Sequence, residues 1–107
     1  MIKTLVTDGS FKQSLGIVRS LGKDGFKPYI LSSKKGSLCS YSKFSNKEIV
    51  LHSKDYKNKL SNYLMKYSIE LIIVVGTNSF KCILPLKEDL KKIGVNIVSV
   101  DIDKLNL

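Results

Sequence analysis

The chain has 107 residues, 43% of them hydrophobic, which suits one domain with its own core and leaves no room for two. Its longest apolar run, residues 71–75, is far shorter than the roughly 20 residues of a membrane helix; with no signal-peptide pattern at the start, we expect a cytoplasmic protein. Eighteen basic and nine acidic residues give a net charge of +9, which raises the hypothesis of a nucleic-acid partner.

A strand, a helix and a second strand are predicted at the start of the chain. Residues 4–7 are short and rich in β-forming side chains. Residues 11–24 place their apolar side chains on one helical face, with Ser10 as N-cap and Gly25 as the stop. The second strand is expected within residues 27–32.

The middle of the chain is predicted to hold a long loop, a short strand and a helix. Residues 33–47 are rich in Ser and Lys and lack periodicity, which indicates a loop with at most a helical turn. Residues 48–51 form a short strand. Residues 55–67 carry apolar side chains at helical spacing.

Residues 71–75 are the clearest strand, and their apolar character throughout predicts a sheet covered on both faces. Residues 76–78 are expected to leave the sheet as a loop. Pro85 suits the first turn of a helix that Gly94 ends, and residues 96–102 form the last strand. The inner face of that last helix is assigned to Leu86, Leu90 and Ile93.

The alternation of strands and helices predicts one α/β domain, a Rossmann-like three-layer structure with about five parallel strands in the order 3-2-1-4-5. In such sheets ligands bind at the carboxyl ends of the strands, where the strand order reverses. The segments to follow are therefore residues 8–14, after the first strand, and residues 76–79, after the fourth.

Residues 8–13 open the first helix, where backbone N–H groups and the helix dipole can hold an anion. The segment lacks the second and third glycines of a dinucleotide-binding fingerprint and the Gly-Lys-Ser/Thr of a phosphate-binding loop. The alternative is structural: Gly9 permits a tight turn, and Gly16 and Gly22 permit close packing of helix and sheet.

Two other groups of residues were considered for chemistry. Lys43 is a weak candidate for anion binding, although a surface lysine beside one core aromatic, Phe44, is the favoured interpretation. Cys82 is interpreted as a buried apolar residue and Cys39 as a loop thiol. With His52 as the single histidine, the sequence contains neither a metal site nor a catalytic set.

The basic charge by itself does not predict a specific nucleic-acid site. Arg19 is the single arginine, and arginine supplies the fork that recognises phosphate and guanine. The lysines are scattered along the chain, which favours a solvated surface. With neither a reading helix nor an aromatic platform, we expect no tight DNA binding. We expect only a weak, sequence-blind attraction to polyanions at low salt that vanishes by physiological ionic strength.

Short motifs carry a resemblance over nearly the whole chain. They are Leu5-Val6-Thr7-Asp8-Gly9, Leu15-Gly16-Ile17-Val18-Arg19-Ser20-Leu21-Gly22, Gly25, Ser32-Ser33, Ser42-Lys43-Phe44, residues 71–76 and Leu84-Pro85-Leu86. The chain resembles the N-terminal (pre-ATP-grasp, biotin-carboxylase N-terminal-like) domain of ATP-grasp enzymes, and among them the carbamoyl-phosphate-synthase-like carboxylate–amine ligases. Lys43 stands where that family usually has arginine, which removes a bidentate anion contact.

The resemblance implies that residues 1–107 are the N-terminal part of a longer ATP-dependent ligase. Such an enzyme activates a carboxylate as an acyl phosphate and joins it to an amine or ammonia. ATP and Mg²⁺ are expected in the downstream ATP-grasp domain, so the isolated chain should be inactive and should not bind ATP tightly. The residues expected to contact the small carboxylate or amine substrate are Gly9, Ser10, Phe11, Thr77 and Asn78.

Two alternatives to the ligase have a similar alternation of strands and helices. A stand-alone nucleotide- or nucleic-acid-binding module would share the same alternating pattern. A response-regulator-like receiver would need an acidic cluster after the first strand and an aspartate after the third, where the chain has His52-Ser53. The receiver is set aside, and no membrane partner is expected.

Overall fold

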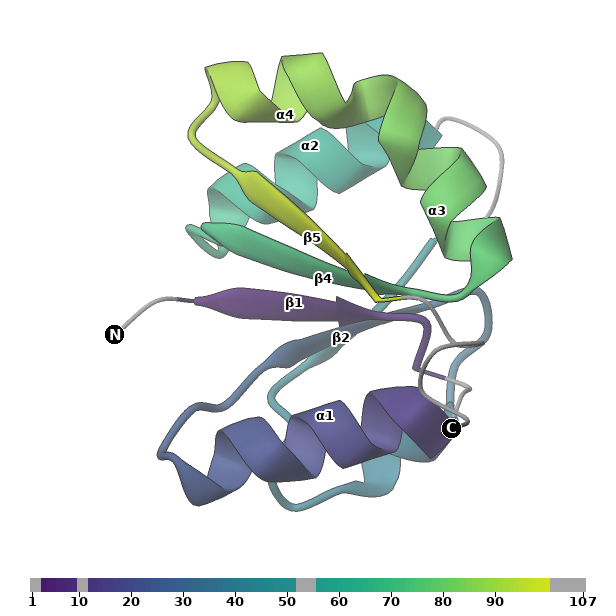
Figure 1. Ribbon diagram of the computed structural model, residues 1–107, viewed down its shortest axis with the longest axis vertical. Coiled ribbons are helices and arrows are strands. Elements are labelled where there is room, and N and C mark those ends of the chain that lie inside the picture. The colour runs from purple at the N-terminus through teal and green to yellow at the C-terminus, as the bar shows by residue number, and fades with distance from the viewer. Residues whose placement is uncertain (1–2, 10–11, 52–55, 101–107) are drawn as a thin grey trace.

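The computed structural model describes residues 3–9, 12–51 and 56–100, and within them five parallel strands form one sheet in the order β3-β2-β1-β4-β5 (Figure 1). This arrangement confirms the predicted fold class and strand order. The strands are β1 (Thr4–Thr7), β2 (Tyr29–Ser32), β3 (Glu48–Val50), β4 (Leu71–Val75) and β5 (Asn96–Val100).

Helices cover both faces of the sheet, with α1 on one side and α2, α3 and α4 on the other (Figure 1). The helices are α1 (Lys12–Lys23), α2 (Tyr56–Lys66), α3 (Thr77–Ile83) and α4 (Lys87–Lys92), and two 3₁₀ turns are η1 (Leu38–Tyr41) and η2 (Leu84–Leu86). The predicted first two helices are thus confirmed to within one residue at each described end. The helical turn expected in the long loop is η1.

The hydrophobic core is divided by the sheet into two clusters. Strand β1 lies in the centre, and its successive side chains alternate, with Leu5 in the cluster under α2 and Val6 in the cluster under α1. All four of its residues are buried. The α1 side is covered less completely towards the edge of the sheet, where Val98 of β5 is 49% exposed and Ile73 of β4 is half-buried. The expectation that β4 is covered throughout on both faces is therefore only partly met.

The prediction for the last helical segment was wrong in two respects. A helix, α3, begins directly after Gly76, where a loop was expected, and the helix expected from Pro85 to Gly94 is observed as the 3₁₀ turn η2 followed by α4. Pro85 lies in the first turn of η2, as expected for a residue that has no N–H to donate to a helical carbonyl. Ile93 is 44% exposed, because α4 ends at Lys92 and the chain turns at Gly94. None of the described helices has the length and apolar character needed to cross a bilayer.

Candidate functional site

The carboxyl ends of β1 and β4 meet at the point where the strand order reverses. Thr7 and Val74 are paired in the sheet, and the Asp8 N–H donates to the Val75 carbonyl at 3.2 Å. Gly9 follows on one strand, and α3 starts at Thr77 on the other. The two segments that the sequence singled out are therefore neighbours at one edge of the sheet, where parallel α/β folds bind their ligands.

Gly9 is the point where the first loop is held most tightly. Its N–H donates to the Leu31 carbonyl at 3.0 Å, and its carbonyl accepts from the Cys39 N–H at 2.9 Å. A Cβ at this position would lie 2.5 Å from Cγ2 of Ile30 and 2.6 Å from Oγ of Ser37, so a side chain does not fit. The amide expected to hold an anion is engaged within the fold, and Gly9 instead lets three segments pack closely.

The structure describes only part of the remaining predicted substrate residues. Ser10 and Phe11 lie outside the described residues. Thr77 and Asn78 are the first two residues of α3, and the structure describes their backbone. Thr77 and Asn78 thus adjoin the switch point, and contact of any of these residues with a substrate stays a prediction.

Lys43 lies apart from these two loops. Its ammonium is 5.1 Å from the ring centroid of Phe44, and that ring packs against Gly22 near the C-terminal end of α1. Gly22 is ten residues after Lys12, which is about 15 Å along a helix axis. An anion held by Lys43 would therefore be bound beside the other end of α1.

Two buried hydroxyl groups flank the first loop. Thr7, the last residue of β1, is 1% exposed, and Ser14, in the first turn of α1, is fully buried. Within the described part of the chain neither Oγ1 of Thr7 nor Oγ of Ser14 has a hydrogen-bond partner. Buried hydroxyls are rarely left unpaired in folded proteins, so each of these two could pair with a water molecule or another polar group.

A second loop is fixed next to Gly9 by the carboxylate of Glu48. Oε1 accepts from the Gly36 N–H at 2.7 Å, and Oε2 accepts from the Ser37 N–H at 3.0 Å and from the hydroxyls of Ser37 and Ser32. Burial raises the pKa of Glu48, but the hydrogen bonds from these donors, that of the Ser37 hydroxyl above all, lower it by more. The net pKa is therefore below the ordinary value. Sequence analysis missed this contact because Glu48 and its partners are far apart in the chain.

The two cysteines occupy the reverse of their predicted environments. Cys39 is buried in η1, and Cys82 is exposed on α3. Burial, with a further contribution from the negative charge of Asp8, raises the pKa of the Cys39 thiol to about 11. Cys39 is therefore a protonated, inert thiol at neutral pH. The hydrophobic surroundings of η1, which the loop assignment did not anticipate, account for the error.

This difference gives a direct test of the described packing. A chromogenic disulfide reagent should modify Cys82 rapidly and leave Cys39 unreacted until the protein unfolds, because thiolate content and access both disfavour Cys39. The count of fast-reacting thiols in native and denaturant-unfolded protein measures this. Replacing Cys82 with serine should remove the fast phase; a fast phase that persists would contradict the burial of Cys39.

Metal ligation is not supported by the described residues, among which no group of three or more His, Cys, Asp or Glu side chains could hold an ion. Two surface hollows, of about 280 and 340 Å³, lie away from the switch point. One lies between β3 and α2, and the other between the end of α2 and the turn after α4.

Comparison with known proteins supports the fold and nothing finer. Neither a family model nor a curated protein matches this sequence. A solved structure from Mesorhizobium loti, named as that of an NADPH:quinone reductase, matches with a TM-score of 0.60 and 10% identity. The match covers 95% of this chain and 37% of the other, so the chain spans little more than a third of that protein's length. At this identity the likeness shows a shared Rossmann-like α/β fold.

Proposed function

We propose that this domain is the N-terminal substrate-site domain of an ATP-dependent carboxylate–amine or ammonia ligase of the ATP-grasp type, similar to the large subunit of carbamoyl-phosphate synthase. The observation that carries the proposal is the meeting of the β1–α1 loop and the start of α3 at the switch point of a 3-2-1-4-5 sheet. The motifs of the ATP-grasp N-terminal domain fall on these same elements, since Leu5 to Gly9 run through β1 and residues 71–76 run through β4.

The role of the domain in this proposal is to position a substrate. The described residues do not fit ATP or Mg²⁺, because they offer no glycine-rich phosphate loop and no group of carboxylates. The ATP-grasp domain expected later in the chain would supply the phosphorylating chemistry. The two loops that carry the predicted substrate residues would form one wall of the cleft and hold the small carboxylate or amine; these residues are Gly9, Ser10, Phe11, Thr77 and Asn78. The buried hydroxyls of Thr7 and Ser14 are polar groups beside that wall.

The rival proposal is a stand-alone nucleotide-binding module. NADPH, which the name of the structural neighbour mentions, is bound in dinucleotide folds through a glycine fingerprint that residues 8–13 lack. The amides of Asp8 and Gly9 donate to Val75 and Leu31, so they are engaged within the fold in either case. The missing glycine fingerprint is the observation that favours the ligase domain.

The first test is the gene. A reading frame that continues beyond Leu107 into an ATP-grasp domain is the expected result, and a stop codon at that point would favour the stand-alone module. In the full-length enzyme, ADP formation that depends on a carboxylate and an amine should then be measured across a substrate panel. Titration calorimetry of residues 1–107 with ATP and Mg²⁺ should show no micromolar binding; such binding would overturn the proposal.

With a substrate in hand, replacing Ser10 or Asn78 with alanine should raise its KM by about fivefold or more, the effect of losing one substrate hydrogen bond. The value of kcat should change less, since these residues position the substrate rather than react with it. Matched controls are Ser20→Ala on α1 and Asn58→Ala on α2, both exposed and away from the switch point. Equal KM values in all four variants would remove these loops from the site.

A further inference from the structure

Three tyrosines and three lysines, distant in the sequence, form one surface that we name the tyrosine–lysine face. Tyr67 is at its centre: its ring centroid lies 5.0 Å from that of Tyr29 and 6.3 Å from that of Tyr63, with the rings of Tyr63 and Tyr67 nearly parallel at 3°. The ammonium groups of Lys47 and Lys66 lie 5.5 and 5.4 Å from the Tyr67 centroid. The members of the face are Tyr29, Tyr63, Tyr67, Lys47, Lys59 and Lys66.

The face continues into the hollow between α2 and the edge strand β3. This groove of about 280 Å³ is lined by Val50, Lys59, Asn62, Tyr63 and Lys66. Tyr63 and Lys66 belong to both the ring cluster and the groove, so the two form a continuous surface. The rings of Tyr63 and Tyr67 are half-buried, and Lys47, Lys59, Asn62 and Lys66 are exposed.

Positive charge on this face is not neutralised by the described residues. Helix α2 contains no acidic residue, and its Lys57 is paired at 2.8 Å with Asp89 of α4. Within the described part of the chain Lys47, Lys59 and Lys66 have no such carboxylate partner. The interaction with the Tyr67 hydroxyl raises the pKa of Lys47, so this ammonium stays protonated at neutral pH, and it lowers the pKa of Tyr67.

We propose that the tyrosine–lysine face binds single-stranded nucleic acid without regard to sequence. Exposed lysines can neutralise the phosphates, and tyrosine rings beside them can stack on bases, which is how single strands are held when no base is read. The rings favour a nucleic acid over an acidic peptide, which gains nothing from stacking. The lack of arginine on the face, and of a protruding helix, favours a single strand over a duplex.

This proposal departs from two sequence-based expectations. The first is that the chain has no aromatic platform; the three tyrosines lie on β2 and α2 and just beyond it, so no local pattern predicted one. The second is that attraction to polyanions is diffuse and vanishes by physiological ionic strength; in this proposal the attraction is localised and persists to about 0.15 M salt. It is independent of the ligase proposal, because the face lies on the α2 flank and not at the switch point.

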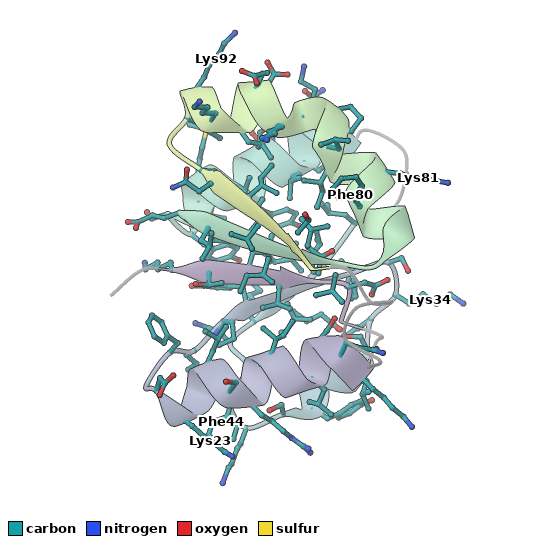
Figure 2. All side chains as sticks on the ribbon, in the orientation of Figure 1. Lys23, Lys34, Phe44, Phe80, Lys81 and Lys92 are labelled. Carbon is teal, nitrogen blue, oxygen red and sulfur yellow. The ribbon has the colours of Figure 1, made fainter. Side chains whose placement is uncertain are left out.

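The test uses the 107-residue chain and a short, fluorescently labelled oligothymidylate in an anisotropy titration at increasing salt. Replacing Lys47, Lys59 and Lys66 with glutamine should weaken binding by about tenfold or more and should reduce the slope of log affinity against log salt by about 0.7 per lost phosphate contact. The control variant replaces Lys23, Lys34 and Lys81 with glutamine, which changes the net charge by the same amount. These lysines project from α1, the β2–η1 loop and α3 (Figure 2). It should lose less than about threefold, since only long-range charge is removed.

The rings provide a second readout. The protein has five tyrosines and no tryptophan, so its intrinsic emission reports on tyrosine alone, and base stacking should quench it. Tyr67→Leu should weaken binding by about fivefold or more. Tyr67→Phe should bind within about twofold of the wild type, because the ring and not the hydroxyl stacks on a base. Circular dichroism verifies that each variant is folded.

Several outcomes would overturn the proposal. Equal losses in the two lysine triples would show diffuse attraction, as would equal affinity for duplex and single strand. Full displacement of the oligonucleotide by polyglutamate of matched charge, with no effect of Tyr67→Leu, would assign the face to acidic proteins. Absence of binding even at low salt would also contradict it.

Discussion

Replacing Gly22 with alanine should destabilise the domain by about 1–3 kcal/mol, although alanine is the better helix former by about 1 kcal/mol. Gly22 lies in the last turn of α1, and a Cβ there would be 2.2 to 2.5 Å from Cγ, Cδ1 and Cβ of Phe44. Because Phe44 Cβ sits close to its own backbone, the conflict is not relieved by a rotation of the ring alone. The loop that carries Phe44 would have to move away from the core cluster under α1.

Gly16 provides the matched control in the same helix. It is exposed, and a Cβ there would meet nothing within 4 Å, so Gly16→Ala should stabilise the domain by about 0.5–1 kcal/mol. In urea denaturation followed by circular dichroism, the midpoint of Gly22→Ala should lie below that of the wild type and the midpoint of Gly16→Ala above it. Phe44→Leu should cost less in the Gly22→Ala background than alone, because the smaller side chain relieves the contact. Midpoints shifted in the same direction by both alanines would contradict the described contact of α1 with Phe44.

The two glycines also show how far a sequence pattern reaches. Both Gly16 and Gly22 were expected to permit packing of α1 on the sheet, because a glycine within a helix indicates a close neighbour. Gly22 has one, but it is the loop residue Phe44 and not the sheet, and Gly16 has none. The difference depends on where a loop twenty residues later returns, which no local pattern contains.

The fold was more predictable than the site for a physical reason. The alternation of apolar periods is local and identifies strands and helices, and the rules of chirality and crossover then restrict the order of a parallel sheet. Helix α3 escaped prediction because the sequence of residues 77–83 mixes polar and apolar side chains without a clear apolar stripe, and its buried anchor, Ile83, comes at the end. The position of the switch point followed from topology, whereas the contacts around Gly9 depend on Leu31, Ser37 and Cys39 from separate segments.

Replacing Glu48 with glutamine should destabilise the domain by about 1–2 kcal/mol at neutral pH, the lower part of the range for hydrogen bonds to a charged group, because the carboxylate is partly exposed. The two carboxylate oxygens accept from Gly36, Ser37 and Ser32, and these residues offer donors to both. A glutamine has the same shape but must turn its NH₂ group towards one of those donors. The loop that packs against Gly9 would lose contacts with β3, and the effect should extend to the switch point.

The pH dependence separates loss of charge from loss of shape. The net pKa of Glu48 in the folded protein is below its ordinary value of 4.5, so its stabilising contribution is complete above that pH and is lost as the pH falls through the folded pKa. Urea denaturation of wild type and Glu48→Gln at a series of pH values should therefore give a difference that is constant near neutrality and shrinks in acid, where the protonated carboxyl resembles the amide. Glu70→Gln, at an exposed glutamate, is the control and should show little difference at any pH. If the free energies of unfolding of the wild type and Glu48→Gln differed equally at neutral and acid pH, the charge of Glu48 would not be what holds the loop.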